Sequence, residues 1–90
     1  MEVEYDSRKS ATNLRKHGIS FKEASSCFYD QIALTMEDSH SESEYRWILI
    51  GLSRRQRCLT VVYTLRDEIV RIISARKSTI REKRDYAKRV

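Results

Sequence analysis

The chain has 90 residues, which fits one domain with a small core, and it has no run of about 18 apolar residues that could cross a membrane. Its charge is uneven. Residues 1–45 carry 5 basic and 9 acidic side chains (net −4), whereas residues 46–90 carry 13 basic and 4 acidic ones (net +9), and the halves sum to +5. The basic half predicts a polyanion partner, with nucleic acid as the first candidate; a merely solvated surface is the alternative.

The chain end and the cysteines indicate the compartment. The N-terminus is acidic and lacks an apolar block, so we expect no secretory signal. Cys27 and Cys58 are far apart, without the spacing of a metal site, and both are expected to be small buried side chains. We therefore expect a cytoplasmic protein with no membrane association.

A short strand and a helix are predicted first. Residues 2–6 alternate between acidic and apolar side chains, a strand pattern. Asp6 can cap a helix over 7–16, on which Ala11 and Leu14 form the apolar stripe. Gly18 then ends this helix in the left-handed conformation.

A second helix is predicted over residues 20–28. Ser20 and Glu23 have the S-x-x-E spacing of a capping box. One face of the helix is apolar and faces the core. That face comprises Phe21, Ala24, Cys27 and Phe28.

The middle of the chain reads as strands. Residues 32–36, 44–52, 59–65 and 69–75 have strand patterns, with an exposed loop at 38–43 and tight turns between the last three. Strands joined by short turns predict an antiparallel meander. The basic turn at 54–57 is expected to be a solvated hairpin tip.

Residues 69–75 are apolar on both faces, which is typical of a central strand. Arg71 and Arg76 interrupt this segment at an odd spacing, so they are predicted to project to opposite faces. Ser78 can cap a basic final helix to about 88. The predicted fold is a single α+β domain over 1–90: two N-terminal helices packed on an antiparallel sheet, with a basic C-terminal helix.

Several blocks of residues, taken in order, resemble a known family. They are Lys16-His17-Gly18-Ile19-Ser20-Phe21-Lys22-Glu23-Ala24, Ile50-Gly51, Arg71-Ile72-Ile73-Ser74-Ala75-Arg76 and Glu82-Lys83-Arg84-Asp85-Tyr86. With Asp6 and Asn13 they resemble the BrnT family of type II toxins, although Tyr5 stands where that family usually has tryptophan. The resemblance implies a RelE-like fold, growth arrest by RNA cleavage and neutralisation by a BrnA antitoxin. It also implies operator DNA binding only through the toxin–antitoxin complex.

Three residues are predicted to be catalytic. Cutting RNA without a metal needs a base, an acid and cations that stabilise the phosphate. His17 is the acid–base candidate because histidine titrates near neutral pH; alternatively it only ends its helix. Arg76 is predicted to bind phosphate, or else to form an ion pair with an acid of the neighbouring antiparallel strand or of the last helix. Tyr86 is predicted to stack on a base or act as acid, or else to pack that helix.

Four further cations are predicted to bind substrate: Lys9, Lys16, Arg66 and Arg71. Lys9 and Lys16 are seven residues apart and share a helix face, whereas Arg66 could be solvated and Arg71 could be structural. Asp38, His40 and Glu42 alternate and could touch a metal, but the pattern is weak, so we predict no metal and no cofactor.

The sequence thus predicts a metal-independent endoribonuclease toxin with an RNA substrate and a BrnA-like protein partner. Two other classes stay open. One is a basic module that binds nucleic acid without cutting it, recognisable by steep salt dependence. The other is a protein-interaction module whose basic half docks an acidic partner.

Overall fold

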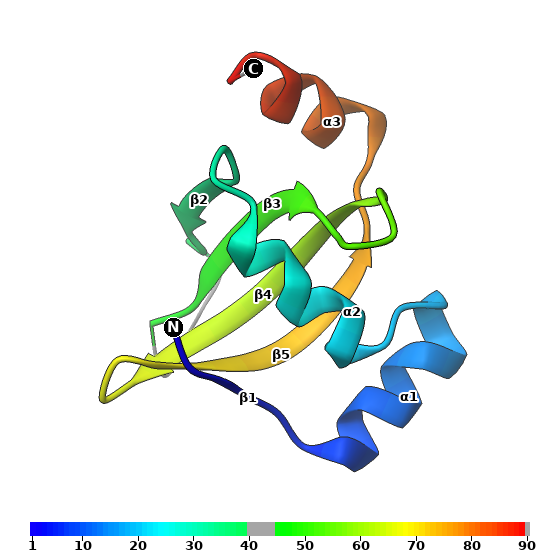
Figure 1. Cartoon of the computed structure of the whole chain (residues 1–90), viewed down its shortest axis with the longest axis vertical. Coiled ribbons are helices and arrows are strands. Elements are labelled where there is room, and N and C mark those ends of the chain that lie inside the picture. Colours follow the sequence, from blue (N-terminus) through cyan, green and yellow to red (C-terminus); the bar gives the residue numbers. More distant parts are fainter. Residues whose placement is uncertain (40–44, 90) are drawn as a thin grey trace.

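The structure, a computed structural model, describes residues 1–39 and 45–89. This part of the chain forms one five-stranded sheet, in the order β1-β5-β4-β3-β2, with three α-helices and a short 3₁₀ helix (Figure 1). The strands are β1 (Val3–Glu4), β2 (Leu34–Glu37), β3 (Trp47–Leu52), β4 (Cys58–Arg66) and β5 (Ile69–Lys77). The helices are α1 (Ser7–His17), α2 (Phe21–Ser26), η1 (Cys27–Tyr29) and α3 (Ile80–Ala87).

The predicted α+β architecture is confirmed, with one difference in the sheet. Strands β3 to β5 form the expected antiparallel meander, β2 extends it by pairing antiparallel with β3, and β5 is internal as predicted. β1 instead pairs parallel with β5, and the Val70 N–H donates to the Glu2 carbonyl at 2.9 Å. The expectation of a purely antiparallel sheet was therefore wrong, because a two-residue strand gives no sign of its partner's direction. The predicted loop at 38–43 lies mostly outside the described residues.

Strand β5 contains one extra residue. Tyr63 stands opposite Ile72 and Val62 stands opposite Ser74, which leaves Ile73 unpaired in the ladder. An insertion of this kind is a β-bulge, and it reverses the alternation of faces beyond it.

The bulge corrects the predicted directions of two arginines. Arg71 stands opposite Thr64 and Arg76 stands opposite Thr60, and these two threonines share one face of β4. Arg71 and Arg76 therefore project from the same face, not from opposite faces, because the count of two residues per period assumed an uninterrupted strand. The burial of β5 agrees with this reversal. Its core members are Val70, Ile72 and Ala75.

Helix α1 has the predicted ends but not the predicted stripe. The Asp6 side chain accepts hydrogen bonds from the backbone N–H groups of Arg8 and Lys9, and Gly18 closes the helix with φ 73°. Ala11 and Leu14 are exposed, Leu14 by 51%, whereas the buried residue of the helix is Asn13. The prediction of an apolar stripe was wrong because the buried amide of Asn13, not an aliphatic side chain, holds this helix to the sheet.

Helix α2 covers the sheet in front of β4, as Figure 1 shows. Ser20 caps it by accepting from the Glu23 N–H at 3.1 Å. The Glu23 side chain does not return to complete the predicted capping box, since Ser53 and Arg57 bind it instead. The predicted core side chains Phe21, Ala24 and Cys27 are all buried.

Helix α3 lies at the opposite end of the molecule from α1 and packs against β3 (Figure 1). Its cap is Thr79 rather than the predicted Ser78, and Thr79 forms a full capping box with Glu82. Ser78 is instead buried, with its hydroxyl 2.8 Å from that of Thr60. Tyr86 is the buried residue of this helix, so a single aromatic ring anchors a mostly charged segment.

Candidate functional site

A hollow of about 320 Å³ lies between α1 and β5. We call it the α1–β5 hollow. None of the described residues that line it is acidic. Its basic lining consists of Arg8, Lys9, Lys16 and His17, and Ile73 and Ser74 of the bulge form its floor.

The helical period explains why these side chains meet. Lys9, Asn13, Lys16 and His17 follow the i, i+4, i+7 and i+8 pattern of one helix face. Arg8 belongs to the same region because it precedes Lys16 by eight residues, about two turns. The sequence reasoning missed Arg8, although this spacing could have identified it.

Asn13 fixes the angle at which this face meets the sheet. Its amide nitrogen donates to the carbonyls of Ile19 and Ala75, both at 2.8 Å, and its amide oxygen accepts from the Ala75 N–H at 3.2 Å. The side chain is only 6% exposed. Loss of these bonds would leave buried backbone groups without partners, so the amide is a strong constraint on α1.

A buried ion pair holds the end of α1 beside His17. Arg57 donates from Nη2 to the Gly18 carbonyl at 3.2 Å and forms an ion pair with Glu23, whose carboxylate also accepts from the Ser53 hydroxyl at 2.7 Å. The hydrogen bond from Arg57 lowers the pKa of Glu23 despite its burial. The prediction of a solvated tip at 54–57 was therefore wrong for Arg57, because its guanidinium binds Glu23, an acid 34 residues earlier in the sequence.

Asp6 is the acid whose charge interacts with this basic face. The backbone N–H groups of Arg8 and Lys9 lower its pKa, and the charges of the two side chains contribute less. Because the carboxylate caps the start of α1, it does not neutralise Lys16 at the other end of the helix. The described lining of the hollow therefore carries a net positive charge.

Arg76 lies in a different place. Its guanidinium donates to both carboxylate oxygens of Glu82, from Nη1 at 2.7 Å and from Nη2 at 2.9 Å. The Thr60 hydroxyl and the Thr79 N–H also donate to Glu82. These bonds, with that of Arg76 first, lower the pKa of Glu82 to about 2. Arg76 thus makes the ion pair with the last helix that the sequence left open, while its side chain stays 45% exposed.

Tyr86 also has an acidic partner. Its hydroxyl donates to Asp30 Oδ2 at 2.6 Å, and burial together with this carboxylate raises the pKa of Tyr86 to about 12. A phenol of that pKa releases its proton less readily than an ordinary tyrosine. We call Arg76, Glu82, Tyr86 and Asp30 the α3 cluster; none of them lines the α1–β5 hollow.

The structure therefore brings together only some of the predicted site residues. Lys9, Lys16 and His17 share the α1–β5 hollow, whereas Arg76 and Tyr86 belong to the α3 cluster. Arg71 pairs with Glu4 at 3.1 Å, and Arg66 is exposed at the end of β4. Neither of these two arginines lines the hollow.

Residues 1–39 and 45–89 contain neither a metal-ligand cluster nor a membrane-spanning helix. In that part of the chain, no group of three or more His, Cys, Asp or Glu could hold a metal ion. His40 and Glu42, which the sequence reasoning considered weakly as ligands, lie outside it. No helix within the described ranges has the length and apolar character needed to cross a membrane.

Comparison with known proteins shows the family. No curated protein sequence matches the chain. The crystal structure of the Brucella abortus ribonuclease toxin BrnT, determined at 1.1 Å, resembles this fold with a TM-score of 0.65, over 88% of this chain and 97% of that one, at 22% identity. A family model described as "Ribonuclease toxin, BrnT, of type II toxin-antitoxin system" matches residues 5–82. The chain therefore belongs to the BrnT family of ribonuclease toxins of type II toxin–antitoxin systems.

Proposed function

We propose that this chain is a metal-independent endoribonuclease that cuts RNA at the α1–β5 hollow. The observation that supports this proposal best is that one hollow brings His17 together with Lys9, Lys16 and Arg8, while none of its described lining residues is acidic. A cationic hollow attracts a phosphodiester, and an imidazole beside it can move protons near neutral pH.

In this mechanism, His17 accepts the proton of a ribose 2′-hydroxyl. The 2′-oxygen then forms a bond to the adjacent phosphorus while the bond from phosphorus to the 5′-oxygen breaks. The leaving oxygen takes a proton from the protonated imidazole or from water. Lys9, Lys16 and Arg8 neutralise the charge that gathers on the phosphate in the transition state.

The α3 cluster has a secondary place in this proposal. Arg76 would have to exchange Glu82 for a phosphate before it could bind RNA closely. Tyr86 would likewise have to leave Asp30. We therefore assign Arg76, Arg66 and Arg71 to contacts with RNA that flanks the cut, while the buried Tyr86 holds α3 against the rest of the fold.

The remaining proposals follow from family membership. The fold is RelE-like, the protein acts in the cytoplasm, and its activity arrests growth. A BrnA-like antitoxin neutralises it, and the operator is bound only by the complex of the two proteins. Expression of the chain alone should stop growth, and co-expression of the antitoxin should restore it.

Cleavage of single-stranded RNA in the presence of EDTA tests the proposal. Lys16→Ala should lower the cleavage rate by roughly 10-fold or more, because it removes a cation from the hollow. Arg15→Ala is the matched control. Arg15 is the preceding residue of the same helix and does not line the hollow, so its variant should cut at the wild-type rate.

Two results would contradict the proposal. Equal cleavage rates for Lys16→Ala and Arg15→Ala would show that the α1–β5 hollow takes no part in cleavage. Salt-dependent binding of RNA by the wild-type protein without any cleavage would favour the non-catalytic nucleic-acid-binding module instead.

A further inference from the structure

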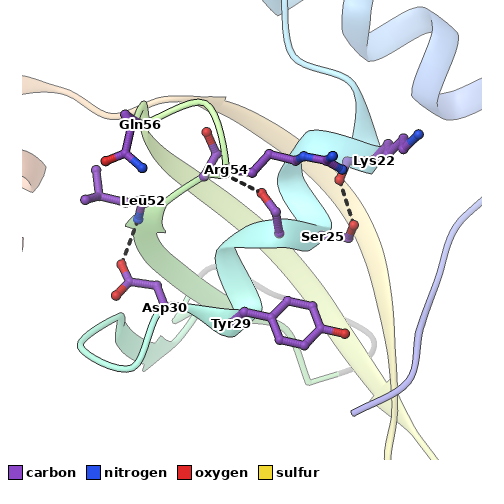
Figure 2. Close-up of a pocket in the computed structure, with 9 residues that line it drawn as sticks. Lys22, Ser25, Tyr29, Asp30, Leu52, Arg54 and Gln56 are labelled. Atoms are coloured by element: carbon purple, nitrogen blue, oxygen red, sulfur yellow. Dashed lines mark hydrogen bonds between the residues drawn. The ribbon is translucent and has the colours of Figure 1, made fainter.

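A second hollow, of about 620 Å³, lies between α2, η1 and the turn that joins β3 to β4. Figure 2 shows its lining: Lys22, Ser25 and Tyr29 on one side, Asp30 and Leu52 on the other, and Arg54 between them. We infer that this hollow is a subsite for a nucleotide of single-stranded RNA. Tyr29 stacks on the base, and Lys22 and Arg54 bind the neighbouring phosphates. The inference rests on the proposed ribonuclease function and adds a binding location to it.

Tyr29 is the first reason. Its side chain is 73% exposed although it follows Phe28, whose ring packs edge-on against Tyr63 at 4.9 Å between centroids. In the described part of the chain, the Tyr29 ring contacts no other aromatic ring and its hydroxyl makes no hydrogen bond. An exposed aromatic face can stack on any base, so it suits a binding mode that tolerates different sequences.

The two cations are the second reason. Figure 2 shows the Arg54 side chain extending across α2 toward Lys22. Neither side chain forms an ion pair within the described ranges. The backbone beneath them is fixed, because the Arg54 N–H donates to the Ser26 hydroxyl at 2.8 Å and the Ser25 hydroxyl donates to the Lys22 carbonyl at 2.7 Å. Both cations line the same hollow as Tyr29 and are available to an anion.

The positive charge extends beyond this hollow. Lys22 and Arg54 also line a smaller hollow of about 200 Å³ together with Arg55, whose side chain is 67% exposed. Arg55 lies 3.8 Å from Glu23, at the limit of an ion pair. A strand of RNA that leaves Tyr29 past Lys22 and Arg54 would therefore meet one further cation, Arg55.

Among the described residues that line the hollow, Asp30 is the one acid, and its carboxylate oxygens already accept hydrogen bonds. Its carboxylate accepts from the N–H groups of Ile32 and Leu52, at 3.1 and 2.8 Å, and from the Tyr86 hydroxyl. Figure 2 shows the carboxylate turned toward Leu52 and away from Lys22. It therefore does not neutralise the side of the hollow that faces Tyr29.

An RNA strand fits this surface better than an acidic protein segment does. The carboxylates of such a segment would bind Lys22 and Arg54 but leave the ring face and the hydroxyl of Tyr29 exposed. A nucleotide uses both parts, since its base stacks while its phosphates bind the cations.

The test measures binding of a short single-stranded 2′-O-methyl RNA, which lacks the attacking hydroxyl and is not cut. Tyr29→Ala should weaken binding roughly 5- to 150-fold, whereas Tyr29→Phe should keep it, because stacking needs the ring and not the hydroxyl. Tyr45→Ala is the matched control; Tyr45 is 74% exposed and should be replaceable without effect. Arg54→Ala should make the plot of log affinity against log salt shallower by about 0.7, the effect of one lost phosphate contact on a single strand.

The outcomes separate the nucleotide subsite from the ribonuclease proposal. If RNA is bound and cut but Tyr29→Ala and Tyr45→Ala bind it equally well, the subsite is overturned while the ribonuclease proposal stands. If the wild-type protein binds no RNA, both fail. If poly-L-glutamate binds with the same dependence on Tyr29 and Arg54, the surface recognises polyanions or acidic proteins in general, and the nucleotide subsite is overturned.

Discussion

The α1–β5 hollow and the α3 cluster both contain predicted site residues, but they differ in whether a carboxylate binds those residues. Lys16 and His17 line a hollow whose described lining holds no carboxylate, whereas Glu82 binds Arg76 and Asp30 binds Tyr86. A cation that already has a carboxylate must give it up to bind a phosphate. The number of basic residues is therefore a poor guide to a site; the position of the acids decides which cations are available.

The same comparison changes the meaning of the uneven charge. Two acids of the negative half, Glu4 and Glu23, pair with Arg71 and Arg57 of the positive half. Ion pairs within the fold thus compensate part of the charge difference between the two halves of the chain. The cations without a carboxylate include some from the negative half itself, on α1 and α2.

The largest effect on stability is expected from removing the Asn13 side chain, which holds α1 against β5 and so supports the hollow. Asn13→Ala removes three hydrogen bonds and leaves the backbone groups of Ala75 and Ile19 without partners. The free energy of unfolding should fall by roughly 1–3 kcal/mol for each orphaned group that stays buried. Urea denaturation measures this. Leu14→Ala, on the exposed side of the same helix, should change stability by less than about 0.5 kcal/mol. Similar losses for the two variants would show that Asn13 does not hold α1.

A smaller effect is expected in the α3 cluster, and it depends on pH. The folded-state pKa of Glu82, about 2, lies below its ordinary value of 4.5. The ionised carboxylate therefore stabilises the fold fully above about pH 4.5, and this contribution disappears as the pH falls toward 2.

Thermal unfolding of the wild-type protein and of Glu82→Gln isolates this contribution from the other carboxylates. The wild type should melt at a higher temperature at neutral pH, and the difference should shrink through that window. Because Arg76 is 45% exposed, solvent limits the size of the difference. A difference that stays constant with pH would mean that the ion pair contributes nothing to stability.

Some local signals in the sequence were reliable. The caps at Asp6 and Ser20 and the left-handed Gly18 depend only on neighbours, so the starts of α1 and α2 and the turn after α1 could be predicted, whereas the start of α3 was misplaced by one residue. The shared face of Lys9 and Lys16 follows from helical spacing alone, so this part of the proposed site could be predicted before the fold was known.

Non-local features could not be predicted in the same way. A bulge at Ile73 is invisible in the alternation of apolar residues, yet it decides that Arg71 and Arg76 share a face. The partner of Arg57 is 34 residues away, and that of Arg71 is 67 residues away. Such pairs depend on the finished sheet, so whether an arginine was available or paired had to come from the structure.

Single-turnover cleavage of RNA in EDTA by His17→Gln and Arg76→Ala, compared side by side, tests the central claim most directly. His17→Gln keeps a polar side chain but cannot accept the 2′-hydroxyl proton, so its rate should fall roughly 10²- to 10⁴-fold. Arg76→Ala should remain within about 10-fold of wild type, less than the loss of a transition-state donor would cause. The reverse order, with His17→Gln active and Arg76→Ala nearly inactive, would place the chemistry at the α3 cluster and contradict the account.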